Sequence, residues 1–288
     1  LALAVGCGEP EESASNADAY ASHLPDDRLL VALPTGGANR SVGDTADSYL
    51  TTVQVSTDVN GMIGHVLDLV DHVTSFEPTY SSEDDEYLWG PWNDGGLDPN
   101  ETALYVRYDA TADEYGWAFV QRPKTSTSDD AWVPIIAGTA TEGETPDTGS
   151  GGFIIDFDAI ASLNPAEQNR GIFASNYDIR EDGVDAEAGF QAFSDDGGAN
   201  SIDAGYHYGQ DATGAGYMDL AYLADIQEDG SAEETIVLRT RWMADGAGRG
   251  DMVILGGDLG PLVFQGSECW NDGFSVTFEE NNAEMVRD

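Results

Sequence analysis

Lysine is almost absent from this sequence. Lys124 is the only one, and Lys and Arg together number 11 against 54 Asp and Glu in 288 residues, a formal net charge of −43. A chain with so few basic residues cannot neutralise many phosphates, so nucleic acid and anionic membrane surfaces are excluded as default partners. Self-repulsion of this size favours a salty or Ca²⁺-containing setting, where the carboxylates are screened.

Long apolar runs and catalytic motifs are also missing. No segment approaches the ~20 consecutive apolar residues of a membrane-spanning helix, and the Gly-Xaa-Ser-Xaa-Gly motif of serine hydrolases is absent. Cys269 has no histidine near it in the sequence, which gives a thiolate mechanism little support. With 41% hydrophobic and 10% aromatic residues, however, the chain can bury a core and is not a disordered acidic tail.

The N-terminus carries the features of a targeting segment. Its first residues, Leu1 to Val5, are apolar and are followed by Gly6 and Cys7, after which the sequence turns polar. This pattern predicts that residues 1–7 are a truncated signal peptide with a lipobox and that Cys7 is acylated, so that the membrane is a partner through this lipid. The alternative is a disulfide between Cys7 and Cys269; both interpretations imply export.

The rest of the chain divides into a tether and one domain. The composition of residues 8–43 predicts a flexible acidic tether that ends in a short docking segment, 29–33. The predicted domain covers residues 44–288. Apolar residues at three- and four-residue spacing predict an amphipathic helix, most regular over 58–73, or two helices broken near Asn60-Gly61. Its buried face should include Ile63, Val66 and Val70.

After this helix the pattern is that of strands. Short runs rich in Val, Ile, Tyr, Phe and Trp alternate with Asp/Gly turns, which predicts about ten antiparallel strands in a meander. A helical turn is expected over 159–168. The predicted fold is therefore mainly β, an up-and-down barrel or half-barrel with the helix packed on it; a β-sandwich is the alternative. The expected strands are 103–108, 115–121, 132–139, 153–157, 172–179, 186–193, 202–208, 217–223, 235–242, 252–255 and 274–278.

One acidic loop has the spacing of a Ca²⁺ site. Oxygen donors stand at its first, third, fifth, seventh and ninth positions, with Gly230 at the sixth to permit a sharp turn. Ile236 at position twelve excludes a complete helix-loop-helix site, so the options are a Ca²⁺ loop between strands and an ordinary acidic turn. No other cofactor is expected. The candidate ligands are Asp225, Gln227, Asp229, Ser231 and Glu233.

Tryptophans provide a candidate ligand site. Trp89, Trp92 and Trp117 fall on or near predicted strands, where they would point into the barrel or along its rim. An aromatic lining would suit an apolar or carbohydrate ligand. The same side chains would equally suit a filled core.

As a whole, the sequence resembles a family of uncharacterised lipoproteins from myxobacteria and related Gram-negative bacteria. The resemblance implies an envelope location, with Gly8 after the Cys favouring the outer membrane, and it brings no known activity or ligand. It rests on the lipobox-like start and on Val59-Asn60-Gly61, Trp89-Gly90-Pro91-Trp92, Asp156-Phe157-Asp158, Gly246-Ala247-Gly248-Arg249 and Glu268-Cys269-Trp270.

Three functions fit these observations. The first is a lipid-anchored binding protein for a hydrophobic or carbohydrate ligand. The second is a structural or interaction protein of the cell surface, supported by the charge and the turn-rich meander. The third is an extracellular hydrolase, for which the sequence contains no motif. A large empty interior lined by aromatic residues would support the first function, and a fully packed interior the second.

Overall fold

Fourteen antiparallel strands form one sheet, in the order in which they occur along the chain. The computed structural model describes residues 24–25, 27–34, 45–81, 86–92, 99–145, 148–226 and 232–285. The strands are β1 (Tyr80–Ser81), β2 (Glu86–Trp92), β3 (Asn100–Asp109), β4 (Glu114–Pro123), β5 (Val133–Glu142), β6 (Gly149–Asp156), β7 (Arg170–Arg180), β8 (Gly183–Ser194), β9 (Ile202–Asp211), β10 (Gly216–Ala224), β11 (Glu234–Trp242), β12 (Gly248–Leu255), β13 (Leu262–Trp270) and β14 (Val276–Met285).

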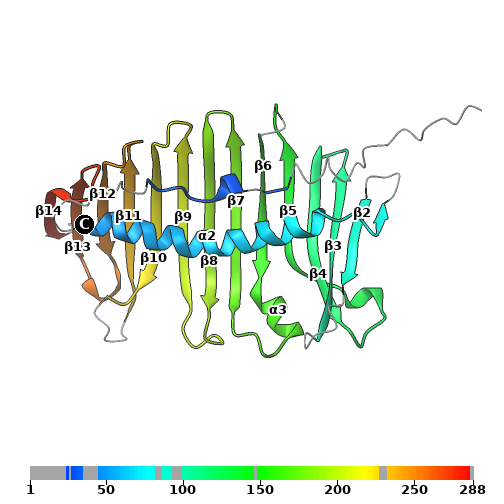
Figure 1. Cartoon of the computed structure of the whole chain (residues 1–288). Helices are drawn as coiled ribbons and strands as arrows, with labels where there is room; N and C mark the ends of the chain where they lie inside the picture. Colours follow the sequence, from blue (N-terminus) through cyan, green and yellow to red (C-terminus); the bar gives the residue numbers. More distant parts are fainter. Residues whose placement is uncertain are drawn as a thin grey trace, which may run out of the picture.

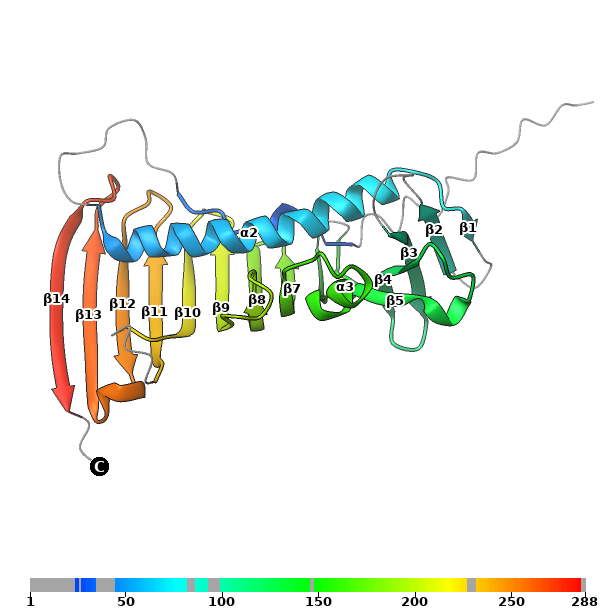
Figure 2. The ribbon, with the colours of Figure 1, turned by 90° about the horizontal axis from the view of Figure 1, so that it is seen from below.

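The sheet is open, since β1 and β14 lie at its two ends (Figures 1 and 2). It curls most strongly at the β2–β5 end, where the strands wrap around the end of the long helix (Figure 2). The mainly β up-and-down meander with a packed helix is thus confirmed, in the form of a half-barrel. β1, β2 and β13 had no counterpart among the expected strands. In β13, Gly266, Glu268 and Cys269 interrupt the apolar alternation on which strand prediction depends.

In the described part of the chain, one long helix, α2 (Asp47–Thr74), crosses one face of the sheet, which we call the inner face (Figures 1 and 2). Its 28 residues give a length of roughly 42 Å. The helix is continuous through Asn60-Gly61, because apolar residues on one stripe are buried on both sides of this point. Ile63, Val66 and Val70 are 0%, 2% and 3% exposed, as the sequence predicted.

Side chains from two strands hold the chain at the two ends of α2. Its N-cap residue, Ala46, offers no side-chain acceptor, and the carboxylate of Glu268 on β13 instead accepts from the backbone N–H groups of Asp47 (3.1 Å) and Ser48 (2.8 Å). A carboxylate here satisfies free N–H groups and matches the positive end of the helix dipole. Beyond the other end of the helix, Trp89 Nε1 on β2 donates to the carbonyl of Phe76 (2.8 Å).

The segment before α2 also packs on the inner face. The side chain of Asn60 makes two hydrogen bonds with the backbone of Val31, at 2.8 and 2.9 Å, and Gln210 Nε2 donates to the carbonyl of Ala32. Leu29 and Val31 are buried. The apolar patch that was expected to dock at the end of the tether therefore belongs to the core, and packing begins ahead of Asp44.

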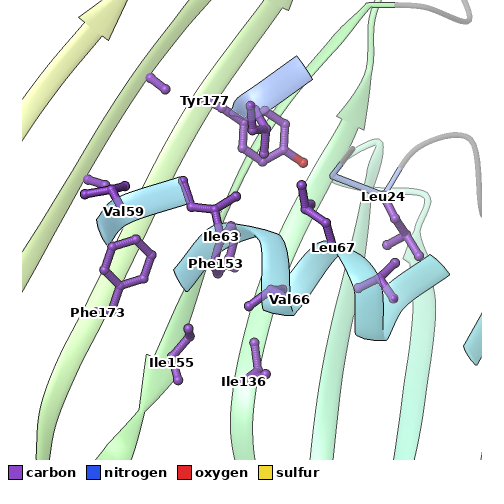
Figure 3. Packing of buried hydrophobic residues seen from close by; sticks show 14 of the residues in the cluster. Leu24, Val59, Ile63, Val66, Leu67, Ile136, Phe153, Ile155, Phe173 and Tyr177 are labelled. Carbon is purple, nitrogen blue, oxygen red and sulfur yellow. The ribbon is translucent and has the colours of Figure 1, made fainter. Parts of the chain in front are cut away.

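The core lies between α2 and the inner face of the sheet. Val59, Ile63, Val66 and Leu67 of the helix point toward aromatic and branched side chains of β5–β7 (Figure 3). Strand side chains alternate between the two faces, so every second residue reaches this layer. The sheet residues visible there are Ile136, Phe153, Ile155, Phe173 and Tyr177.

Short helices complete the fold. α3 (Phe157–Leu163) replaces the expected turn over 159–168, and Asp156 caps it by accepting from the N–H of Ala159 (2.8 Å). No helix among the described residues is long and apolar enough to cross a membrane. The 3₁₀ turns are η1 (Asp27–Leu29), η2 (Asp129–Ala131) and η3 (Gly257–Leu259).

Candidate functional site

The face of the sheet opposite α2, the outer face, is where polar side chains gather. On β7–β11 the residues that alternate with buried ones project to this side, as Arg180 does after buried Ile179 and Asp219 does between buried Met218 and Leu220. Register places one row of these residues across five neighbouring strands. The row is Asn176, Glu187, His207, Asp219 and Arg239.

Beside this row the outer face is hollowed. The neighbouring row consists of small residues over four strands, and it leaves a groove of about 490 Å³ whose rim is the polar row. Gly205 has no atom closer than 3.8 Å to where a Cβ would stand, so the groove is open above it. We call this hollow the groove; its floor is Ala174, Gly189, Gly205 and Ala221.

Three polar side chains of the outer face form a closed cluster. The Nε2 atom of His207 lies 2.9 Å from Asp185 Oδ1 and 3.1 Å from the hydroxyl of Tyr217, which donates to Asp185 Oδ2. An ionised carboxylate only accepts, so Nε2 of His207 carries a proton. No hydrogen bond among the described residues uses the other ring nitrogen, Nδ1.

Electrostatics keep Asp185 and Tyr217 each in one protonation state at neutral pH. Burial raises the pKa of Asp185, but the hydrogen bonds from Tyr217 and His207 outweigh it, and the net pKa lies below the usual range. Burial and the hydrogen bond to Asp185 raise the pKa of Tyr217 to about 12. Asp185 is therefore an anion and Tyr217 a neutral donor.

Two arginines frame the cluster. The Arg241 guanidinium lies 4.9 Å from the centre of the Tyr217 ring and forms hydrogen bonds with both carboxylate oxygens of Asp219, at 2.6 and 3.1 Å. Arg180 pairs with Asp178 and Asp182. The Tyr217 ring rests on Gly209, where a Cβ would come within 2.4 Å of a ring carbon, so only glycine fits there.

Between these arginines lies a second hollow, at the end of the sheet that carries the β7–β8 and β9–β10 turns. Its volume is about 480 Å³. Aspartates from both turns, Asp182 and Asp211, complete its lining, and we call it the end pocket. Hydroxyl-bearing and planar polar ligands match such a lining, while nucleophilic catalysis has no support: no Ser, Thr or Cys among the described residues is hydrogen-bonded to His207.

Within the described residues, the tryptophans predicted as a ligand site lie in the main core or against it. Trp89 and Trp117 are 1% and 3% exposed and form part of the main core, and Trp92 is half-buried against it. Trp117 lies over Gly138, where a Cβ would stand 2.6 Å from its ring. Their packing is that of core residues, the alternative that the sequence left open.

The remaining predicted sites are only partly described. Asp225 is half-buried and Glu233 exposed, whereas Gln227, Asp229 and Ser231 lie outside the described residues, as does Cys7. Within the described ranges, no three His, Cys, Asp or Glu side chains come together as a metal site. Ca²⁺ binding and acylation of Cys7 remain predictions.

Comparisons with known proteins found no relative of this chain. A scan against protein-family models, a search of curated proteins and a search of solved structures each found no match. Function must therefore be argued from the geometry of the two faces.

The outer-face cluster of Asp185, His207 and Tyr217 was not predicted from the sequence. Its members lie on β8, β9 and β10 and meet only through the register of three strands. A pattern that points to them exists: polar residues two apart, Asp185-Xaa-Glu187 and Tyr217-Xaa-Asp219, on the side of each strand that the core does not use. Spacing of this kind marks an outward face but does not give the register.

Proposed function

We propose that this protein is a lipid-anchored, non-catalytic binding protein of the cell envelope, and that it binds carbohydrate on the outer face of its sheet. The observation that carries this proposal is the groove. Planar polar side chains along its rim, such as Asn176, Glu187 and His207, can form paired hydrogen bonds with hydroxyl groups. Its small floor residues let a ligand approach the backbone.

Of the two ligand classes that the sequence favoured, carbohydrate has the better support. A hydrophobic ligand needs an apolar cavity, and the apolar side chains of the inner face pack against α2 and the segment before it. Four strand spacings separate β7 from β11, about 19 Å at the usual distance between strands. The groove therefore suits an extended chain lying across the strands.

An interaction protein of the cell surface is the second candidate. Its support is the same packed interior, together with β14, a ten-residue strand at the end of the sheet order. An end strand of this length offers one row of backbone N–H and C=O groups to a partner strand. Failure of the carbohydrate experiment below would favour this function.

The groove can be filled by mutation at Gly205, where an added Cβ would meet no atom closer than 3.8 Å. Gly205→Ile places a branched side chain on the floor of the groove, in a strand that tolerates it. Val253→Ile is the matched control, because Val253 stands in the same cross-strand row but outside the groove. Co-sedimentation with polysaccharide from the envelope of the source cells should be lost in Gly205→Ile and kept in Val253→Ile. No co-sedimentation of the parent, or equal binding by Gly205→Ile, would contradict the proposal.

The lipid anchor has a test of its own. Cys7→Ser should move the protein from the membrane fraction to the soluble fraction, because a diacylated cysteine holds a soluble domain at a bilayer. Intact mass of the protein from its source should show the acyl chains. A mass without a lipid increment, or a disulfide between Cys7 and Cys269, would refute acylation.

A further inference from the structure

We infer that the end pocket, formed around Asp185, Tyr217, Arg180 and Arg241, is a second subsite that binds one neutral sugar unit. This inference rests on the proposed function and deepens it. At about 480 Å³ the end pocket falls within the range of small-molecule sites, roughly 300–1,000 Å³. The groove and the end pocket lie on either side of the polar row: His207 lines the groove, and its partner Asp185 lines the end pocket.

Charge decides the class of ligand. Two arginines and three aspartates line the end pocket, so its charges nearly balance in a protein of net charge −43. A cation would compete with Arg180 for Asp182 and would lie beside the positive charges of both Arg180 and Arg241. An anion would meet Asp182, Asp185 and Asp211 and the field of the whole chain. A neutral ligand that exchanges hydrogen bonds with both kinds of group avoids both costs.

The hydrogen-bonding capacity of Asp185 fits a sugar. His207 and Tyr217 each occupy one site, on different carboxylate oxygens. Since each oxygen of a carboxylate can accept two hydrogen bonds, both keep a site for a hydroxyl. Two vicinal hydroxyl groups of a pyranose can donate to one carboxylate in this way, and the Arg241 guanidinium can donate to a third oxygen.

The pocket is also ordered before a ligand arrives. Asp185 is held from two sides, and Tyr217 is fixed between Gly209 beneath it, Asp185 at its hydroxyl and Arg241 at its ring. A ligand that binds fixed side chains does not bear the entropy cost of ordering them. This favours specific binding even of a single sugar unit.

The test uses the Cys7→Ser protein, which lacks the anchor. This protein is titrated in a calorimeter with glucose, galactose, mannose and N-acetylglucosamine. At least one should bind with a Kd in the millimolar range or below. Asp185→Asn should weaken this binding about tenfold, because the amide replaces one acceptor oxygen with a donor. Asp251→Asn is the control, since Asp251 lies on the same face but lines neither hollow. Tyr217→Phe keeps the ring but removes the hydroxyl group that holds Asp185 in place, so this variant should also bind the sugar more weakly.

Two outcomes overturn the inference: none of the four sugars binds, or Asp185→Asn and Tyr217→Phe both bind as the parent does. These outcomes are separate from failure of the proposed function. A polysaccharide that is retained by the parent and lost in Gly205→Ile, without binding of any free sugar, leaves the groove proposal standing and removes the end pocket. A sugar that binds in an Asp185-dependent way, without retention of polysaccharide, does the reverse.

Discussion

The two faces of the sheet differ in what covers them, although the same strands supply both. The inner face is covered by α2 and by the segment around Val31, and its side chains are aromatic or branched. The outer face carries polar side chains joined to one another, such as Arg241 to Asp219 and Arg249 to Asp251. Stability is therefore concentrated on the inner face, and the outer face carries side chains that the core does not require.

The strongest test of this difference is a charge on the inner side of α2. Val66→Asp would bury an unpaired carboxylate at a position that is 2% exposed, which should lower the free energy of unfolding by several kcal/mol. Asp68→Asn, two residues away on the exposed side of the helix, should melt like the parent. If both variants melt like the parent in paired thermal scans, the helix is not packed on the sheet.

A smaller effect is expected where the helix is fixed to β13. Glu268→Ala removes both acceptors of the Asp47 and Ser48 N–H groups, and this should cost about 1–2 kcal/mol, as the loss of a helix cap does. The measurement is urea unfolding. Glu279→Ala is the control, because Glu279 is the register partner of Glu268 on β14 and caps no helix. Equal losses in the two variants would refute the capping role.

The smallest effect should come from the outer face and should depend on pH. The hydrogen bonds from Arg249 and Ser267 lower the pKa of Asp251, and burial opposes them only in part. A lowered pKa in the folded state means that this carboxylate stabilises the fold above its unfolded pKa of about 3.9, and that this contribution is lost as the pH falls through the folded value.

Asp251→Asn should accordingly lower stability by no more than about 1 kcal/mol near neutral pH, since the pair is exposed. The difference between the variant and the parent should shrink as the pH falls below about 4. Melting curves of both proteins over this range provide the measurement. A difference that stays constant down to the lowest pH would contradict the role of the ionised carboxylate.

Periodicity in the sequence predicted most of the fold. The apolar spacing of α2 identified Ile63, Val66 and Val70 as core residues, and alternation identified most of the strands. It missed β1, β2 and β13, and in β13 Gly266, Glu268 and Cys269 obscure the alternation. Glu268 breaks the pattern because its carboxylate serves the N-terminus of a helix more than 200 residues earlier in the chain.

The sequence by itself determined the acidic charge, the meander and the apolar stripe of α2, because each depends on composition or on spacing within one element. Tertiary structure alone decided that Trp89 and Trp117 are core residues and that Asp185, His207 and Tyr217 form one cluster. The physical reason is register. A side chain's strand neighbours are set by pairing along the whole sheet, and shifting one strand by a single residue would turn His207 to the opposite face.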